Sequence, residues 1–190
     1  MANKTVYQTL EDRSNPDEIE EHGPYPCRRE NAWLGNGFYF WDTFINNAHW
    51  WGKEGACYYK GYIICKAECE YNTDECFDLV GETDHIQLFN QSINLMKENG
   101  LLTNKTTVAR VINHIKEELK IFKYSAVRVY GINSKAKNSD FNQILYFNPL
   151  KPQYLDISPA IQICFYHRNS LNLRNYRIVF PEEYIEGYAV

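Results

Sequence analysis

The stretch GFYFWDTFINNAHWWG, Gly37–Gly52, decides the fold of this chain. It places three Trp, one Tyr and three Phe among sixteen residues, which is more flat rings than a core strand or helix usually needs. Its first six residues predict a strand, because aromatic side chains favour extended structure. The residues from 43 to 54 predict a short helix with Thr43 as its N-cap, and Asp42 is expected to cap this helix too. The rings either pack a core or hold a flat ligand.

Composition places the chain among globular proteins. It has 190 residues, of which 44% are hydrophobic, and 15 are Tyr, so we expect one folded domain over residues 1–190. No basic N-terminal segment precedes an apolar run, and no apolar run approaches the ~18 residues that a membrane span needs. The sequence therefore predicts no signal peptide, no membrane span and a cytoplasmic protein. In that compartment the six cysteines are expected to be reduced thiols, and their spacing is not that of a zinc site, so no metal is expected.

Charge is unevenly distributed along the chain. Residues 105–178 carry 12 Lys and Arg against 4 Asp and Glu, a charge of +8. The remainder carries 8 against 20, a charge of −12, and the two parts sum to the formal net charge of −4. The basic part would suit an anionic ligand or a nucleic acid, whereas a solvated surface without a partner explains the same charges.

Strand and helix patterns along the chain predict an α+β fold, since strands lie at both ends and helices lie between them. An acidic helix is expected after Pro16, ending at Gly23. Two amphipathic helices follow within residues 83–121, the first ending at Gly100 and the second covering residues 108–119. Further strands are expected at residues 5–10, 57–71, 76–80, 124–131, 143–149, 160–167 and 176–180.

The segment LGNGFYFWDTFINNAHWW resembles the centre of the ADP-ribosyltransferase superfamily, in its poly(ADP-ribose) polymerase and diphtheria-toxin-like branch. That branch carries a Gly-x-Gly step into an aromatic strand, then a helix with a small residue and a second aromatic. The matching residues here are Gly35, Gly37, Tyr39, Phe40, Asn47, Ala48 and Trp50. The resemblance implies an ADP-ribosyltransferase-like split sheet of mixed and antiparallel strands with flanking helices. The helical segment 83–121 matches nothing in this pattern and is expected to be an insertion.

The same resemblance implies how NAD would be held. Tyr39 and Trp50 would stack on the two faces of the nicotinamide ring, which aromatic side chains do well. Asn47 would hydrogen-bond the nicotinamide amide. In the family's first strand a His followed by Gly holds the adenosine ribose, and here Gln8 and Thr9 fall at those positions. An offset of one residue would place Tyr7 there instead. Gln can replace that His, because its amide both donates and accepts hydrogen bonds.

The family's catalytic Glu lies on a late strand, and Gln162 falls at its position. Gln143 is a second candidate, but Leu171, Leu173 and Tyr176 follow Gln162 as the family pattern requires. A carboxylate at this place stabilises the positive charge that develops on the ribose, and an amide cannot supply that charge. Gln162 can still orient the sugar by hydrogen bonding. The resemblance implies that members without the Glu are mono-transferases or binders without activity.

These residues lead to one functional expectation and several alternatives. The expectation is an NAD-dependent mono-ADP-ribosyltransferase with Gln162 and Tyr39 as its catalytic residues and NAD as its substrate. It would modify a protein or a nucleic acid, act as a toxin or defence effector by analogy, and be controlled by an antitoxin or immunity partner. The alternatives are a non-catalytic NAD-, ADP-ribose- or nucleic-acid-binding module, an NAD glycohydrolase, and an unrelated interaction protein. His49 either approaches NAD or is an exposed helix residue.

Overall fold

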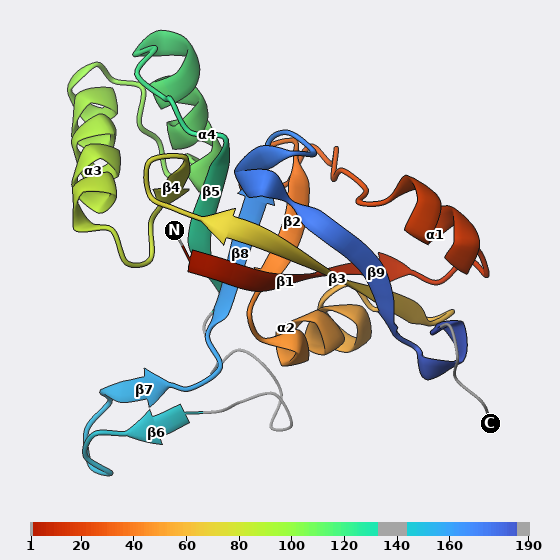
Figure 1. Cartoon of the computed structure of the whole chain (residues 1–190). Helices are drawn as coiled ribbons and strands as arrows, with labels where there is room; N and C mark the ends of the chain where they lie inside the picture. The colour runs from red at the N-terminus through yellow and green to blue at the C-terminus, as the bar shows by residue number, and fades with distance from the viewer. Residues whose placement is uncertain (1, 133–143, 186–190) are drawn as a thin grey trace.

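The computed structural model describes residues 2–132 and 144–185, and it confirms the α+β fold (Figure 1). Its centre is a seven-stranded mixed sheet with the strand order β4-β5-β8-β2-β1-β3-β9. The strands of this sheet are β1 (Ala2–Glu11), β2 (Phe38–Asp42), β3 (Tyr62–Tyr71), β4 (Cys76–Asp78), β5 (Ala126–Ile132), β8 (Ala160–Phe165) and β9 (Arg174–Phe180). A two-stranded sheet of β6 (Ile144–Tyr146) and β7 (Tyr154–Asp156) extends away from the main sheet (Figure 1).

Strands β1 and β2 separate after a short antiparallel contact. In the described chain they pair at Val6–Asp42 and Tyr7–Trp41, and the pairing goes no further. Beyond Tyr7, β1 continues to pair with β3 as far as Glu11. The start of β2 pairs with β8 on its other side. The sheet therefore has a gap between β1 and β2, bordered by paired strands on both sides.

Four α-helices flank the sheet: α1 (Pro16–His22), α2 (Ile45–Trp50), α3 (Thr83–Glu98) and α4 (Val108–Asn113). Proline at the start of α1 and the Thr107 side chain that caps α4 fit the usual helix-start chemistry. Helices α2 and α4 each continue into a π-helical turn, at Trp51–Gly55 and at His114–Glu118. Helices α3 and α4 lie together beside β4 and β5, whereas α2 lies beside β1 (Figure 1).

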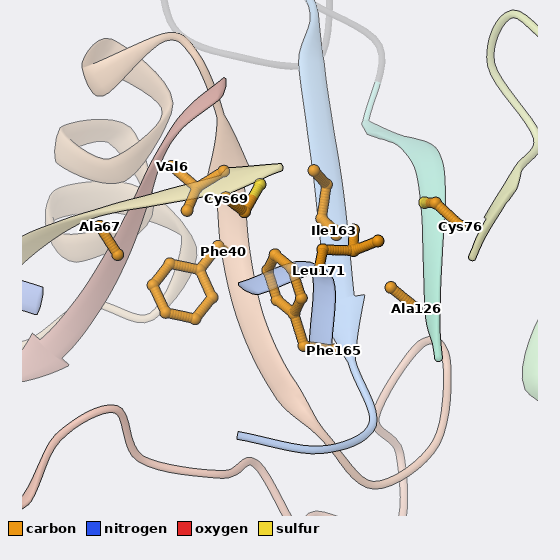
Figure 2. Packing of buried hydrophobic residues seen from close by; sticks show 9 residues of the cluster. All are labelled: Val6, Phe40, Ala67, Cys69, Cys76, Ala126, Ile163, Phe165 and Leu171. Atoms are coloured by element: carbon orange, nitrogen blue, oxygen red, sulfur yellow. The ribbon is translucent and has the colours of Figure 1, made fainter. Parts of the chain in front are cut away.

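One face of the central strands packs a core of small and aromatic side chains (Figure 2). Its members are Val6, Phe40, Ala67, Cys69, Cys76, Ala126, Ile163, Phe165 and Leu171. Phe40 meets Phe165 edge to face, with ring centroids 5.4 Å apart. Because side chains alternate between the two faces of a strand, Phe40 points into this core while Tyr39 and Trp41 point to the other face. One face of the aromatic strand therefore packs in this core, and its other face carries Tyr39 and Trp41.

The predicted caps of α2 are wrong. Phe44 occupies the N-cap position, and Thr43 has a φ of 64° with its hydroxyl donating to Asp42 Oδ1 at 2.8 Å. Asp42 is buried and accepts from Lys4 Nζ at 3.0 Å and from Arg128 Nε at 2.8 Å. Its carboxylate is thus engaged by two cations across the sheet, which leaves it unavailable to a helix terminus.

Most other elements are present with shifted bounds; for example, β1 begins at Ala2, and β6 ends at Tyr146. The strand predicted at 57–71 begins only at Tyr62, because the Gly61 N–H donates to the Tyr58 carbonyl and closes a turn in which Gly61 has a φ of 107°. Strand β7 was not predicted, since it spans three residues in a proline-rich segment. Both helices within residues 83–121 are present, whereas their status as an insertion stays a prediction.

The described part of the chain contains no disulfide, no metal-binding group of side chains and no membrane-spanning helix. All six cysteines are free thiols, and Cys65, Cys69, Cys76 and Cys164 are buried. Within residues 2–132 and 144–185 the His, Cys, Asp and Glu side chains form no group of three arranged to hold a metal ion. None of the described helices combines the length and the apolar character needed to cross a bilayer.

Candidate functional site

A pocket of about 500 Å³ lies where β1 and β2 separate. Its walls come from β1, β2, β8, the loop between α1 and β2, and the π-helical turn after α2. The residues that matter most for its chemistry are Gln8, Thr9, Tyr39, Trp41, Trp51 and Gln162. A pocket of this size is within the range that takes small molecules and nucleotide cofactors.

Four of the six residues predicted for the NAD site line this pocket: Gln8, Thr9, Tyr39 and Gln162. They come from three strands that are far apart in the sequence, and the sheet brings them together. The Thr9 hydroxyl donates to the Ala48 carbonyl at 2.9 Å, which fixes α2 against β1. Tyr7, the alternative to Gln8, packs with the aromatic cluster around Trp41 and is not among the lining residues.

The other two predicted residues, Asn47 and Trp50, lie outside the pocket lining. Asn47 is fully buried, and its Nδ2 donates to the Pro159 carbonyl at 3.0 Å. Trp50 is 6% exposed and packs edge to face against Trp41, with ring centroids 6.1 Å apart. As the helix is arranged here, Asn47 and Trp50 hold α2 to its neighbours, and neither presents a group to the pocket.

Gln8 uses its whole hydrogen-bonding capacity within the protein. Its Nε2 donates to the Tyr25 carbonyl at 2.8 Å and, more weakly, to the Tyr39 carbonyl at 3.5 Å. Its Oε1 accepts from the Tyr25 N–H at 3.0 Å and from the Tyr176 hydroxyl at 2.8 Å. Since an amide oxygen has two lone pairs and an amide nitrogen two protons, Gln8 has no free site for a ribose. It instead fixes the loop that forms one wall of the pocket.

Tyr39 presents a fixed, neutral ring to the pocket. Its hydroxyl donates to the Gly35 carbonyl at 2.6 Å and accepts from the Leu34 N–H at 2.8 Å. Burial, reinforced by the nearby Cys164 thiol, raises the pKa of Tyr39 far above its ordinary value. The phenol therefore stays protonated at physiological pH. With its hydroxyl committed to the loop, Tyr39 can contact a ligand through its ring and does not act as an acid or base.

Gln162 is one of two lining residues with a buried amide oxygen that has no donor in the described chain. It lies in the middle of β8, where its backbone faces Trp41 of β2 and Val129 of β5. The side chain is 6% exposed, and its Oε1 is buried with no donor among the described residues. A buried acceptor without a partner costs roughly 1–3 kcal/mol of stability, so such groups usually serve a ligand or hold a water molecule. Because this oxygen has almost no exposed surface, a bound molecule can reach it only after the Gln162 side chain turns toward the pocket.

An aromatic wall of three Trp faces the pocket: Trp33, Trp41 and Trp51. Trp51 stands 6.0 Å from both Trp33 and Trp41, measured between ring centroids. Trp51 is the first residue of the π-helical turn. The family's spacing from Tyr39 selects Trp50 and does not select Trp51 or Trp33.

Further lining residues carry polar or charged side chains that the family pattern does not select: Glu11, Arg13, Asn15, Arg28, Arg29 and Asn31. The Asn15 Nδ2 donates to Glu18 Oε2 at 2.8 Å, whereas its Oδ1 is buried without a donor in the described chain. The only sequence signal was the Arg pair just before the Gly-x-Gly step, within a loop whose contacts depend on the fold.

His49 fits neither of its two predicted environments. It is half-buried, with Nδ1 3.0 Å from the Tyr62 hydroxyl and its ring 4.9 Å from the ring centroid of Phe180. Burial, assisted by the charge of Lys53, lowers its pKa. The structure places His49 on the side of α2 that packs on β3 and β9, away from the pocket lining. Gln143, the second candidate for the catalytic position, lies outside the described residues.

Comparison with known proteins gives one distant similarity. The chain is 24% identical over 180 residues to an uncharacterized protein of Methanocaldococcus jannaschii, covering 84% of this chain and 80% of that protein. No family model matches the chain, and no solved structure matches it significantly. The similarity extends over most of both chains, so the two proteins are alike beyond a single local motif.

Proposed function

We propose that this chain has the ADP-ribosyltransferase-like fold, binds NAD in the pocket between β1 and β2, and transfers ADP-ribose to a macromolecule as a mono-ADP-ribosyltransferase. One observation carries the proposal. Gln8, Thr9, Tyr39 and Gln162 belong to three separate sequence motifs, yet they line one pocket, and the buried amide oxygen of Gln162 has no donor among the described residues. The short pairing of β1 and β2 also gives the sheet the separation that a split sheet requires.

The reaction would break the bond between the ribose C1′ and the nicotinamide nitrogen. Nicotinamide leaves with the bonding electron pair and becomes neutral, a nucleophilic oxygen or nitrogen of the acceptor bonds to C1′, and the acceptor's proton passes to solvent. After its side chain turns toward the pocket, the orphaned oxygen of Gln162 would accept a hydrogen bond from a ribose hydroxyl and orient the sugar. Tyr39, Trp41 and Trp51 would supply flat surfaces for the nicotinamide and keep water from the anomeric carbon.

The acceptor and the partners follow from charge and analogy. The +8 of residues 105–178 would neutralise phosphates of a nucleic acid, and a protein acceptor fits the same chemistry of transfer. A toxin or defence role with an antitoxin or immunity partner, in the cytoplasm, belongs to the same proposal.

A non-catalytic NAD- or ADP-ribose-binding module is the second candidate, and Gln162 is the observation that favours it. Hydrolysis or transfer through an oxocarbenium-like transition state gains from a nearby negative charge, and the amide of Gln162 has none. Binding needs only the hydrogen bond and the aromatic wall. The two candidates therefore share the ligand and differ in whether nicotinamide is released.

The test is incubation of the purified protein with adenine-labelled NAD and a cell lysate, followed by RNase, DNase or protease treatment. We expect label on macromolecules that one of the three treatments removes, together with release of free nicotinamide. A Gln162→Leu variant should lose both signals, and an exposed Gln91→Ala variant on α3 should keep them. Free nicotinamide without labelled acceptor indicates an NAD glycohydrolase. Bound but intact NAD indicates the non-catalytic module, and absence of binding contradicts both candidates.

A further inference from the structure

We infer that Arg28 and Arg29 form an anion subsite in this pocket and that it takes the pyrophosphate of a dinucleotide. The identity of the ligand as NAD rests on the proposed function. The anion subsite itself rests on the charges and contacts of the pocket, so it can be tested separately.

Charge is the first support. Arg13, Arg28 and Arg29 line the pocket against one acidic residue, Glu11, which gives the lining a formal charge of +2. The lining is positive although the part of the sequence outside residues 105–178 has a charge of −12. Glu11 is already paired with Arg13 at 3.1 Å. Among the described residues, Arg28 and Arg29 have no acidic partner, so their charges remain available to an anion.

The rigidity of the loop is the second support. The backbones of Cys27 and Gly37 exchange two hydrogen bonds, of 2.7 and 3.2 Å, directly beside the Arg pair. The Ala32 N–H donates to the Arg29 carbonyl at 3.0 Å and closes a turn. The Gln8 side chain exchanges two hydrogen bonds with the backbone of Tyr25, which fixes the start of the same loop. The backbone that carries the two guanidinium groups is therefore held in place before any ligand arrives, which lowers the entropic cost of binding.

Two buried amide oxygens show what else the ligand must offer. Asn15 Oδ1 and Gln162 Oε1 both belong to lining residues, and both lack a donor in the described chain. Both oxygens have almost no exposed surface, so a hydroxyl or an amino group of the ligand can donate to them only after these side chains turn toward the pocket. Unpaired guanidinium groups require negative oxygens, which they bind best in phosphates. A molecule with hydroxyl groups on both sides of a pyrophosphate, such as ADP-ribose or NAD, offers both kinds of group.

The experiment measures binding by calorimetry for five probes: NAD, ADP-ribose, ADP, nicotinamide riboside and inorganic pyrophosphate. We expect the four phosphate-containing probes to bind, and NAD and ADP-ribose to bind at least about tenfold more tightly than nicotinamide riboside. Arg28→Gln and Arg29→Gln should each lower the affinity for NAD, ADP-ribose and ADP about tenfold, because each removes roughly one charge-assisted hydrogen bond. Added salt should lower the affinity of the wild type for NAD, ADP-ribose and ADP, and it should lower the affinity of the double variant less.

Arg110→Gln is the matched control, since Arg110 is an exposed arginine of α4 that does not line the pocket. It should leave every affinity unchanged, and thermal unfolding should show that all variants fold. If the Arg28→Gln, Arg29→Gln double variant binds NAD and ADP as the wild type does, the subsite is wrong while the proposed function stands. If ADP and pyrophosphate bind through these arginines but NAD binds no better than ADP and is not consumed, the subsite stands and the proposed function is wrong.

Discussion

Gln8 and Tyr25 exchange two hydrogen bonds across the gap between β1 and the loop after α1, one from Nε2 to the carbonyl at 2.8 Å and one from the N–H to Oε1 at 3.0 Å. The side-chain amide of Gln8 thus pairs with a backbone amide as a neighbouring strand would. It takes the place of the backbone hydrogen bonds between β1 and β2, which end at Tyr7. Both residues line the pocket, so this exchange fixes part of its wall.

Gln8→Ala should therefore destabilise the protein by about 2–4 kcal/mol, because it leaves the N–H and carbonyl of Tyr25 and the Tyr176 hydroxyl without partners. NAD affinity should fall as well, since the loop with Arg28 and Arg29 loses an anchor. Urea denaturation measures the first effect and calorimetry the second. Gln91→Ala, an exposed truncation on α3, should change stability by less than about 0.5 kcal/mol. Equal stabilities of the two variants would show that Tyr25 finds other partners.

Gln162→Leu should separate stability from function. Leu is apolar and has one heavy atom fewer than Gln, so it removes the orphaned Oε1 from the interior of β8 and adds no polar group. We expect the free energy of unfolding to stay the same or rise by about 1 kcal/mol, while NAD binding is lost. Urea denaturation and calorimetry on the same preparation provide both values. A loss of stability of several kcal/mol would mean that the Gln162 amide is satisfied within the fold, and the argument for a ligand at this atom would fail.

How far the sequence predicts this structure depends on whether local pattern or tertiary contact decides each element. The aromatic strand, the amphipathic helix ending near Gly100 and the acidic helix after Pro16 are local patterns, and all three are present. The caps at Asp42 and Thr43 were wrong because Asp42 instead pairs with Lys4 and Arg128, partners that lie on β1 and β5. No local rule can foresee cations that arrive from other strands.

The candidate site divides in the same way. Gln8, Tyr39 and Gln162 each lie on a strand that resembles a family motif, and the sheet brings the three strands to one pocket. An error of one residue in such a match would select a side chain on the opposite face of the strand. The family's step from Tyr39 selects Trp50, whereas the next residue, Trp51, which begins a π-helical turn, lines the pocket. Such a turn has no distinct sequence pattern, so only the structure could show which ring faces the pocket.

Trp51 and Trp50 should respond differently to the same substitution. Trp51→Leu removes a ring from the pocket wall and should weaken NAD about tenfold, with a small change in stability. Trp50→Leu removes a ring that is 6% exposed and should cost about 3 kcal/mol of stability, with the NAD affinity of the folded protein within about twofold of wild type. Tryptophan fluorescence titration with NAD and urea denaturation give the two readings. If Trp50→Leu instead lowered the NAD affinity and Trp51→Leu did not, Trp50 would be the stacking ring.

Arg128 should be among the most costly residues to replace. It donates to Asp42 at 2.8 Å and to Asp78 at 3.0 Å, and both carboxylates are buried. Burial alone would raise the pKa of Asp78, but hydrogen bonds from Tyr71 and the Val80 N–H, together with the charge of Arg128, lower it overall. Arg128→Met leaves two buried charges short of a partner and should cost about 3–5 kcal/mol.

Urea denaturation of Arg128→Met against the exposed control Arg110→Met tests this expectation. The control should remain within about 0.5 kcal/mol of wild type. The cost of Arg128→Met should also shrink when the pH is lowered towards the ordinary pKa of a carboxyl, about 4, because protonation then removes the buried charges. A cost that does not change with pH would show that the aliphatic packing of Arg128, rather than its charge, stabilises the sheet.

Mild acid should destabilise the fold through His85. The Asp78 N–H donates to His85 Nδ1 at 3.0 Å, so that nitrogen must be unprotonated in the native state. Burial lowers the pKa of His85, and the nearby acids Glu82 and Asp78 offset only part of this effect. Since an unfolded His titrates near about 6.5, the unfolded chain binds more protons below that pH, and the free energy of unfolding should fall as the pH drops from about 7.5 to about 5.5. His85→Gln should reduce this slope, leaving the part due to His49, whose pKa is also lowered by burial. Urea denaturation across this pH range measures the slope, and an identical slope in His85→Gln and wild type would show that the native His85 accepts a proton as readily as the unfolded one.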